Sequence, residues 1–161
     1  MAISIGAAYD LEADTIEATT SSGARLRMAA DAAHGSDVAA GPKEALLAAL
    51  AACTSSDVAS ILRKKRQDPR RYEMAVSGDV ADEHPRVFTS IVVEHRVSGD
   101  VSPEALRRSI ELSATRYCPV SAMLSAVARV EHRYLLTDAS GATHMATVAV
   151  VGPDRQIQVN P

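Results

Sequence analysis

Two cysteines are the residues of this 161-residue chain with the clearest capacity for chemistry. Cys53 stands between Ala52 and Thr54, and Cys118 precedes Pro119. Thiolates are nucleophiles, and an oxidised thiol can condense with a second thiol to form a disulfide. A CxxC spacing would favour a redox dithiol motif, and an HxxxH spacing would favour a metal site. The chain has neither spacing. Only the fold can bring the two cysteines together, so the elements that carry them decide whether they act as a pair.

Cys53 lies in a segment that predicts a long helix from Pro42 to about Arg66. Proline suits the first helical position, Glu44 lies in the first turn, and a basic run at the far end complements the helix dipole. The first half of the segment is apolar on nearly every side, which predicts a buried helix rather than an amphipathic one. One small sheet cannot cover such a helix, so we expect a dimer that buries it from both sides.

Cys118 lies where a second helix is expected to stop and a third to begin. Ser102-Pro103-Glu104 provide a cap, a first-position proline and an acidic first turn for the second helix. Pro119 suits the start of a further short helix, which places Cys118 at or next to its N-cap. With Arg116 close by, the residues alone favour Cys118 as the more readily ionised thiol. Cys53, in mid-helix among apolar residues, would need a nearby cation to react.

Alternation of apolar and polar residues predicts strands before and after the helices. The order of strands, long helix, strands, helices and strand indicates an α+β fold with segregated sheets and helices. We expect a single domain over residues 1–136 and a C-terminal extension over 137–161 that adds an edge hairpin or is partly mobile. The expected strands are residues 2–9, 15–19, 24–28, 72–81, 87–98 and 129–136.

Composition argues against several classes of partner. The chain has no Trp, one Phe and four Tyr, so it lacks aromatic platforms for single-stranded nucleic acid, and its net charge of -3 gives no electrostatic footprint for DNA. No stretch approaches the roughly 20 uninterrupted apolar residues of a membrane-spanning helix, and the first residues lack the features of a secretion signal. Reducing compartments keep thiols free. We therefore expect a cytoplasmic protein with no nucleic-acid or membrane partner.

Four segments carry recognisable motifs in a fixed order: GPKEALLAALAACT at 41–54, DVASILRKKRQD at 57–68, PRVFT at 85–89 and RYCPVSAML at 116–124. Together they resemble the OsmC/Ohr family of osmotically inducible and organic hydroperoxide resistance proteins, with the closer likeness to the YhfA-like subgroup. The likeness covers residues 23–136 and leaves the tail outside it.

The resemblance implies an intertwined α+β homodimer, with each long helix in the dimer core and an active site at each subunit interface. It also implies a thiol peroxidase of the antioxidant stress response. Cys53 would attack the O–O bond of a hydroperoxide and become a sulfenic acid, and Cys118 would resolve it as a disulfide. A dithiol reductant, such as a lipoyl-bearing protein, would reopen that disulfide. Neither a cofactor nor a metal is expected.

The first turn of the long helix departs from the pattern of the peroxidase members. They carry a glutamate directly after the motif proline, where it holds an arginine beside the thiolate, but here that position is Lys43 and the carboxylate is Glu44. One residue turns a helix by roughly 100°, so a catalytic role for Glu44 and simple stabilisation of the helix start are equal alternatives. Arg25 and Arg27 are the candidates for the activating arginine, and they point to the same face of an expected strand.

Two functions follow from these residues. The first is a peroxidase that reduces organic hydroperoxides or hydrogen peroxide with Cys53 and Cys118, and the presence of both cysteines in their motifs favours it. The second is a non-catalytic member that binds a small hydrophobic ligand or senses redox state, and Lys43 in place of the glutamate favours it. We take the peroxidase as the main hypothesis.

Overall fold

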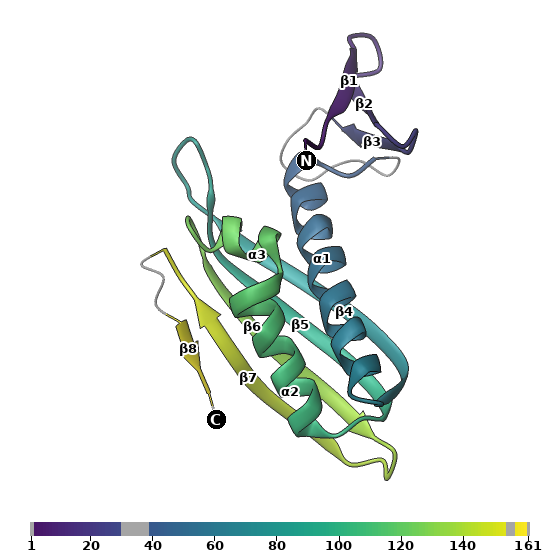
Figure 1. The fold of residues 1–161 in the computed structure, drawn as a ribbon. Coiled ribbons are helices and arrows are strands. Elements are labelled where there is room, and N and C mark those ends of the chain that lie inside the picture. The colour runs from purple at the N-terminus through teal and green to yellow at the C-terminus, as the bar shows by residue number, and fades with distance from the viewer. Residues whose placement is uncertain (1, 30–38, 154–156, 161) are drawn as a thin grey trace. The chain divides into compact units, whose positions relative to one another are not determined.

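A five-stranded sheet forms the larger of two units in this computed structural model, which describes residues 2–29, 39–153 and 157–160 (Figure 1). The sheet belongs to the unit Ala49–Pro161, and its strands are β4 (Asp68–Val80), β5 (Phe88–Asp100), β6 (Arg129–Asp138), β7 (Thr143–Val151) and β8 (Ile157–Val159). They lie in the order β4-β5-β6-β7-β8. β5 and β6 are parallel, whereas the other three pairs are antiparallel.

The smaller unit, Met1–Ala48, contains a three-stranded antiparallel sheet. Its strands are β1 (Ile5–Asp10), β2 (Thr15–Thr20) and β3 (Arg25–Ala29), in that order. The Asp10 carboxylate accepts hydrogen bonds from the backbone N–H groups of Glu12 and Ala13 at 3.0 and 2.9 Å. Such side-chain contacts stabilise tight turns, and this one joins β1 to β2.

The helices form where the sequence supplies start signals. The Ser102 hydroxyl accepts a hydrogen bond from the Ala105 backbone N–H at 3.1 Å, and proline occupies the first turn of the helix that follows. Basic residues end the longest helix and complement its dipole. The helical elements are α1 (Pro42–Lys64), α2 (Pro103–Leu112), a π-helical turn η1 (Ser113–Tyr117) and α3 (Pro119–Leu124).

The core of the larger unit lies between the helices and one face of the five-stranded sheet. Burial alternates along β5, as expected for a strand with one face on the core. β7 supplies Val148 and Ala149, both fully buried, so the sequence beyond residue 136 is part of this core. The main members of the cluster are Val58 and Leu62 from α1, Leu106 and Ile110 from α2, and Val97, Tyr134, Leu136 and Val148 from the sheet.

These elements confirm the predicted α+β class, but α1 is less buried within its own chain than its composition predicts. Its buried residues, Leu50, Thr54, Val58 and Leu62, are spaced every four positions. Within the single chain a sheet covers only one side of the helix, so burial on the other side depends on the expected dimer, which stays a prediction. Although the sequence analysis expected no such segment, α1 is the one helix among the described residues that is long and apolar enough to span a membrane; core helices of soluble proteins meet the same criterion.

Two buried histidines lie side by side beneath the helices, which the sequence analysis did not anticipate. The rings of His95 and His132 have centroids 5.9 Å apart. His95 Nδ1 shares a hydrogen bond of 2.7 Å with the Tyr72 hydroxyl, and His132 Nε2 shares one of 3.3 Å with the Ser121 hydroxyl. Burial lowers the pKa of His132 to about 4 and the pKa of His95 well below its usual value, and the neighbouring His132 further lowers the latter. Both rings are therefore neutral in the folded protein near pH 7.

We predict that acid destabilises the protein through these histidines. An unfolded histidine titrates near pH ~6.5, whereas His132 has a folded pKa of about 4. Between those values the unfolded state binds more protons, so stability falls as the pH drops from 6.5 toward 4. His132 alone should contribute a loss of about 3 kcal/mol. Urea unfolding at intervals from pH 7 to pH 4 measures it.

The variant His132→Asn should unfold with a shallower dependence on pH, while the exposed turn variant His84→Gln should keep the wild-type dependence. An unchanged slope in His132→Asn would show that the buried ring is not the group that titrates.

Candidate thiol site

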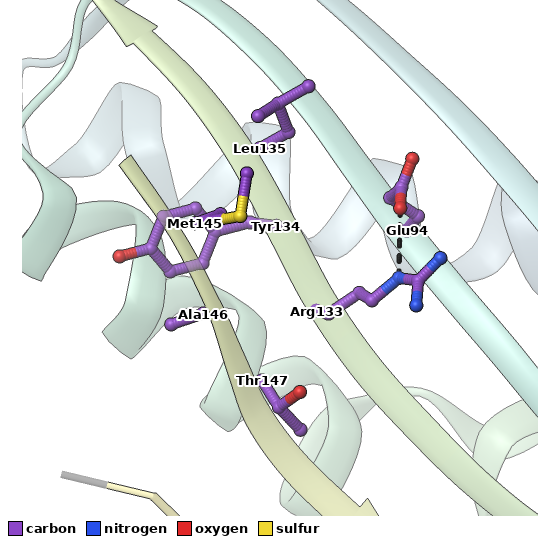
Figure 2. Close-up of a pocket in the computed structure, with 7 residues that line it drawn as sticks. All are labelled: Glu94, Arg133, Tyr134, Leu135, Met145, Ala146 and Thr147. Carbon is purple, nitrogen blue, oxygen red and sulfur yellow. Dashed lines mark hydrogen bonds and ion pairs between the residues drawn. The ribbon is translucent and has the colours of Figure 1, made fainter. Parts of the chain in front are cut away.

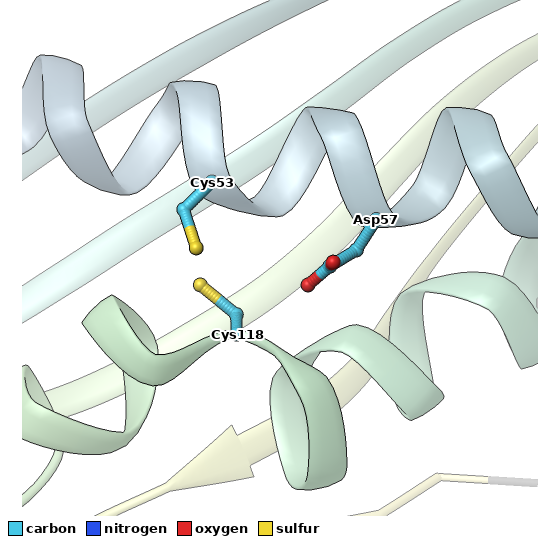
Figure 3. A group of neighbouring side chains, drawn as sticks. All are labelled: Cys53, Asp57 and Cys118. Carbon is cyan, nitrogen blue, oxygen red and sulfur yellow. The ribbon is translucent and has the colours of Figure 1, made fainter. Parts of the chain in front are cut away.

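α1 presents Cys53 and Asp57 on the same face, because residues four apart on a helix lie one turn above the other. The adjoining stripe of α1, which includes Thr54 and Val58, is buried. That packing fixes the rotation of the helix, and with it the direction in which Cys53 and Asp57 point. Both side chains are directed toward the segment that carries Cys118 (Figure 3).

The π-helical turn η1 positions the opposite side of the site. The backbone N–H of Cys118 donates to the carbonyl of Ser113 at 3.0 Å, five residues back, which closes the wider turn. The chain then leaves the helical conformation at Cys118 and restarts as α3 with Pro119 at its beginning. The turn therefore directs two side chains at α1: Ser113 toward Asp57, and Cys118 toward Cys53.

The two sulfur atoms and a carboxylate oxygen of Asp57 all lie within 4.8 Å of one another. The Ser113 hydroxyl donates to Asp57 Oδ2 at 3.0 Å. Cys118 Sγ accepts a hydrogen bond from the Ser121 backbone N–H at 3.3 Å and lies 3.6 Å from the Thr54 hydroxyl oxygen. A disulfide needs an S–S distance of roughly 2.05 Å, so the two sulfurs of the reduced pair must approach each other before they bond.

The electrostatics around Cys53 disfavour a free thiolate. The pKa of the Cys53 thiol is raised to about 11, first by burial and then by the neighbouring Cys118 thiol and the charge of Asp57, while the backbone N–H of Val120 acts in the opposite direction. A thiol with this pKa is protonated at neutral pH and is a weak nucleophile. A positive charge beside the sulfur would favour the thiolate.

The access of the two thiols differs. Cys118 is 3% exposed and Cys53 is half-buried. A molecule arriving from solvent therefore reaches the Cys53 sulfur first.

The remaining predicted site residues lie in the smaller unit. The Glu44 carboxylate accepts a hydrogen bond from the Gly41 backbone N–H at 2.8 Å, as in a capping arrangement at a helix start. Arg25 forms an ion pair with Glu17 at 3.4 Å, and Arg27 is the register partner of Glu17 on the neighbouring strand. Both cysteines belong to the larger unit, so the roles proposed for Glu44, Arg25 and Arg27 toward Cys53 stay predictions.

Arg116, which the sequence places beside Cys118, is occupied elsewhere. Its guanidinium lies over the ring of Tyr117, 5.7 Å from the ring centroid. The neighbouring carboxylate of Glu111 pairs with Arg107 and Arg108. Arg116, the basic residue nearest to Cys118 in the sequence, is therefore directed at an aromatic ring.

A separate depression of about 370 Å³ lies on the other face of the five-stranded sheet (Figure 2). Arg133, Leu135 and Met145 line it, and they alternate along their strands with residues that face the helices. Glu94 Oε2 accepts a hydrogen bond from Arg133 Nε at 2.8 Å at its edge. None of its lining residues is a cysteine, so this depression is separate from the thiol site.

Sequence reasoning missed three residues of the site: Asp57, Ser113 and Thr54. The spacing of Asp57 from Cys53 could have revealed it, since residues four apart share a helix face. No comparable signal existed for Ser113, because a single π turn shifts its direction and leaves no mark in the hydrophobic pattern.

Known proteins resemble this chain in sequence and in fold. A model of the OsmC-like protein family matches residues 33–133. The chain is 38% identical to Protein YhfA of Escherichia coli strain K12 over 99 residues, which make up 61% of this chain and 74% of that protein.

Solved structures extend the likeness. A hypothetical protein from Aquifex aeolicus VF5 is 25% identical, with a TM-score of 0.75 over 86% of this chain and 98% of the other. An organic hydroperoxide resistance protein OsmC from Legionella pneumophila shares the fold at 15% identity, with a TM-score of 0.61 over 82% of this chain and 95% of the other.

We predict that a general thiol oxidant such as diamide converts the reduced protein to a form with one intramolecular Cys53–Cys118 disulfide. The reason is the short distance between the two sulfurs, and no peroxide chemistry is needed. Cross-linking residues this far apart in sequence should stabilise the fold by roughly 2–4 kcal/mol against urea. Peptide mapping by mass spectrometry and urea unfolding measure the two effects. The variants Cys53→Ser and Cys118→Ser should show neither; a disulfide that only joins separate chains would contradict the geometry.

Proposed function

The chain belongs to the OsmC-like protein family, and on that premise we propose that it is a thiol-dependent peroxidase that reduces organic hydroperoxides and hydrogen peroxide. The observation that carries the proposal is the approach of the Cys53 and Cys118 sulfurs to within 4.8 Å. A peroxidase of this kind needs a nucleophilic thiol and a second thiol close enough to capture the oxidised product.

In the proposed reaction the Cys53 thiolate attacks one oxygen of the peroxide, and the O–O bond breaks. The other oxygen leaves as an alcohol after taking up a proton, and Cys53 becomes a sulfenic acid. The Cys118 sulfur then attacks the Cys53 sulfur, the hydroxyl leaves as water, and a disulfide forms. A dithiol reductant, with a lipoyl-bearing protein as our candidate, returns both thiols and is itself oxidised to a disulfide.

The difference in exposure supports this assignment of roles. The half-buried Cys53 can meet a peroxide, whereas Cys118 is 3% exposed and suits a residue that reacts only with its neighbour. The N–H of Ser121 donates to the Cys118 sulfur and holds it at the start of α3.

Activation of Cys53 requires a cation, because its surroundings raise its pKa to about 11. Arg25 and Arg27 of β3 are our candidates, and an arginine within about 4–6 Å of a thiol favours the thiolate. Glu44 would then act by orienting that arginine, in place of the glutamate whose position Lys43 occupies.

We propose that the working form is a homodimer in the cytoplasm. Large apolar side chains are exposed in and beside α3: Tyr117 is 49% exposed, Met123 65% and Val127 58%. α1 also has exposed apolar residues, including Ala49 and Ala52. A second copy would bury both, and a reducing compartment would keep the two cysteines as free thiols between catalytic cycles.

We predict that one equivalent of cumene hydroperoxide removes both thiols of the reduced protein within seconds and yields the Cys53–Cys118 disulfide. Hydrogen peroxide should react by the same route, and the comparison of rates gives the preferred substrate. Cys53→Ser should lose the reaction entirely. Cys118→Ser should form a sulfenic acid that a dimedone probe traps and should fail to turn over with a dithiol.

Arginine variants locate the activating cation in the same assay. Either Arg25→Gln or Arg27→Gln should slow oxidation of Cys53 by at least about tenfold, the loss that one unit of pKa represents. Arg71→Gln is the matched control, because Arg71 is an exposed strand arginine that pairs with Glu73 at 2.7 Å. Oxidation no faster than that of free cysteine would reject the peroxidase. That result would favour the second candidate, a non-catalytic member that binds a hydrophobic ligand or senses redox state. Lys43 at the usual glutamate position and the raised pKa of Cys53 support this second candidate.

We predict that Met123→Glu converts the dimer to a monomer, because a buried unpaired charge at a contact costs several kcal/mol. Analytical ultracentrifugation measures the change in mass. Met145→Glu, a substitution at an equally exposed methionine on the other face of the sheet, should remain a dimer. A wild-type protein that sediments as a monomer would reject this arrangement.

A further inference from the structure

Asp57 is the part of the thiol site that peroxide reduction leaves without a role. Its carboxylate lies within 4.8 Å of both sulfurs. Negative charge at this distance opposes the formation of a thiolate at Cys53, so the carboxylate hinders the first step of a peroxidase. Two thiols and a carboxylate that converge on one point have a different common property, which is that all three can bind the same cation.

The three ligand atoms lie near the spacing that a small tetrahedral ion needs. Zinc binds sulfur at roughly 2.3 Å and carboxylate oxygen at roughly 2.0–2.2 Å, so ligands of one tetrahedral ion are separated by roughly 3.5–3.8 Å. The separations of up to 4.8 Å are a little wider, and rotation of the side chains closes the difference. The ligands come from two elements, since α1 supplies two and the start of α3 supplies the third (Figure 3).

Neighbouring residues already hold the ligands in the required directions. The Ser113 hydroxyl donates to Asp57 Oδ2 at 3.0 Å, which restrains the carboxylate. The Ser121 N–H and the Thr54 hydroxyl lie at 3.3 and 3.6 Å from the Cys118 sulfur. Hydrogen bonds to the ligands are a usual feature of metal sites and contribute to their affinity.

The ligand types select the class of ion. Thiolates bind soft or borderline ions, whereas magnesium and calcium prefer sites made of oxygen alone. Two sulfurs and one oxygen suit zinc(II) or cobalt(II), with a fourth position left for water.

We propose that Cys53, Asp57 and Cys118 of the reduced protein form a binding site for a thiophilic divalent cation of the zinc class. Binding to the reduced protein does not depend on the peroxidase. A consequence that does rest on the proposed function is that ion and disulfide exclude each other. One hydroperoxide and two protons convert the two ion-bound thiolates to a disulfide, an alcohol and water, and the ion is released unchanged. Reduction of the peroxide would thereby be coupled to the release of a metal ion.

Titration of the reduced, metal-free full-length protein with cobalt(II), without oxygen, tests the site. One ion per chain should bind, with a near-ultraviolet thiolate-to-cobalt charge-transfer band and the visible bands of tetrahedral coordination. Zinc(II) should displace it, and competition with a chromogenic chelator then gives the zinc affinity.

Asp57→Asn should lower the zinc affinity by more than tenfold and shift the visible bands while keeping the charge-transfer band. Ser113→Ala should lower the affinity by roughly 10–100-fold through loss of the hydrogen bond to the ligand. Cys53→Ser and Cys118→Ser should each reduce the charge-transfer intensity by about half, the share of one of two thiolate ligands. Asp82→Asn, a change at an exposed turn carboxylate, is the matched control and should bind like the wild type. Circular dichroism shows whether each variant folds, and Ser113→Ala tests the site independently of its three ligands.

Unchanged zinc affinity and cobalt bands in Asp57→Asn would overturn the proposal, as would equal affinity in the variant that lacks both thiols. A lack of peroxidase activity would be a separate result, because that activity is measured on metal-free protein with cumene hydroperoxide. A protein that binds cobalt but ignores peroxide would retain the metal site and lose the enzymatic function; the reverse outcome would retain only the enzyme.

Discussion

The packing of residues 49–64 of α1 within the larger unit is the constraint on which the thiol site depends. Leu50, Thr54, Val58 and Leu62 form one buried stripe, and that stripe fixes the rotation of the helix about its axis. Cys53 and Asp57 lie beside the stripe, so the same apolar contacts that stabilise the fold aim both side chains at Cys118. Dispersion and hydrophobic burial thus do the positioning, and the polar contacts only refine it.

The electrostatics of the thiol site are incomplete without a cation. Two sulfurs and a carboxylate lie together, and burial raises the pKa of the Cys53 thiol. An arginine would satisfy this need and produce a reactive thiolate, whereas a divalent ion would satisfy it and hold both thiolates in place. The peroxidase and the metal site are therefore two ways to neutralise the same cluster of acidic groups. They differ in whether Cys53 is left free to attack a peroxide.

Beneath the thiols, the polar contacts continue into the core. Ser121 donates its backbone N–H to the Cys118 sulfur and shares its hydroxyl with His132, which lies beside His95. Among the described residues, His95 Nε2 and His132 Nδ1 have no hydrogen-bond partner, so each ring is held by one polar contact and by packing. Because both rings are neutral in the folded protein, protonation of histidine below pH ~6.5 favours the unfolded state.

The sequence by itself determined the α+β class, the positions of the helices, and the motifs that identify the family, because proline positions, caps and apolar periodicity are local properties of the chain. It also singled out both cysteines by residue type. Only the tertiary structure decided that Asp57 and Ser113 join them and that His95 and His132 adjoin. It likewise showed that α1 leaves one side uncovered within its own chain. These features depend on contacts between segments far apart in the sequence and on a single π turn, and neither leaves a periodic signal that a sequence displays.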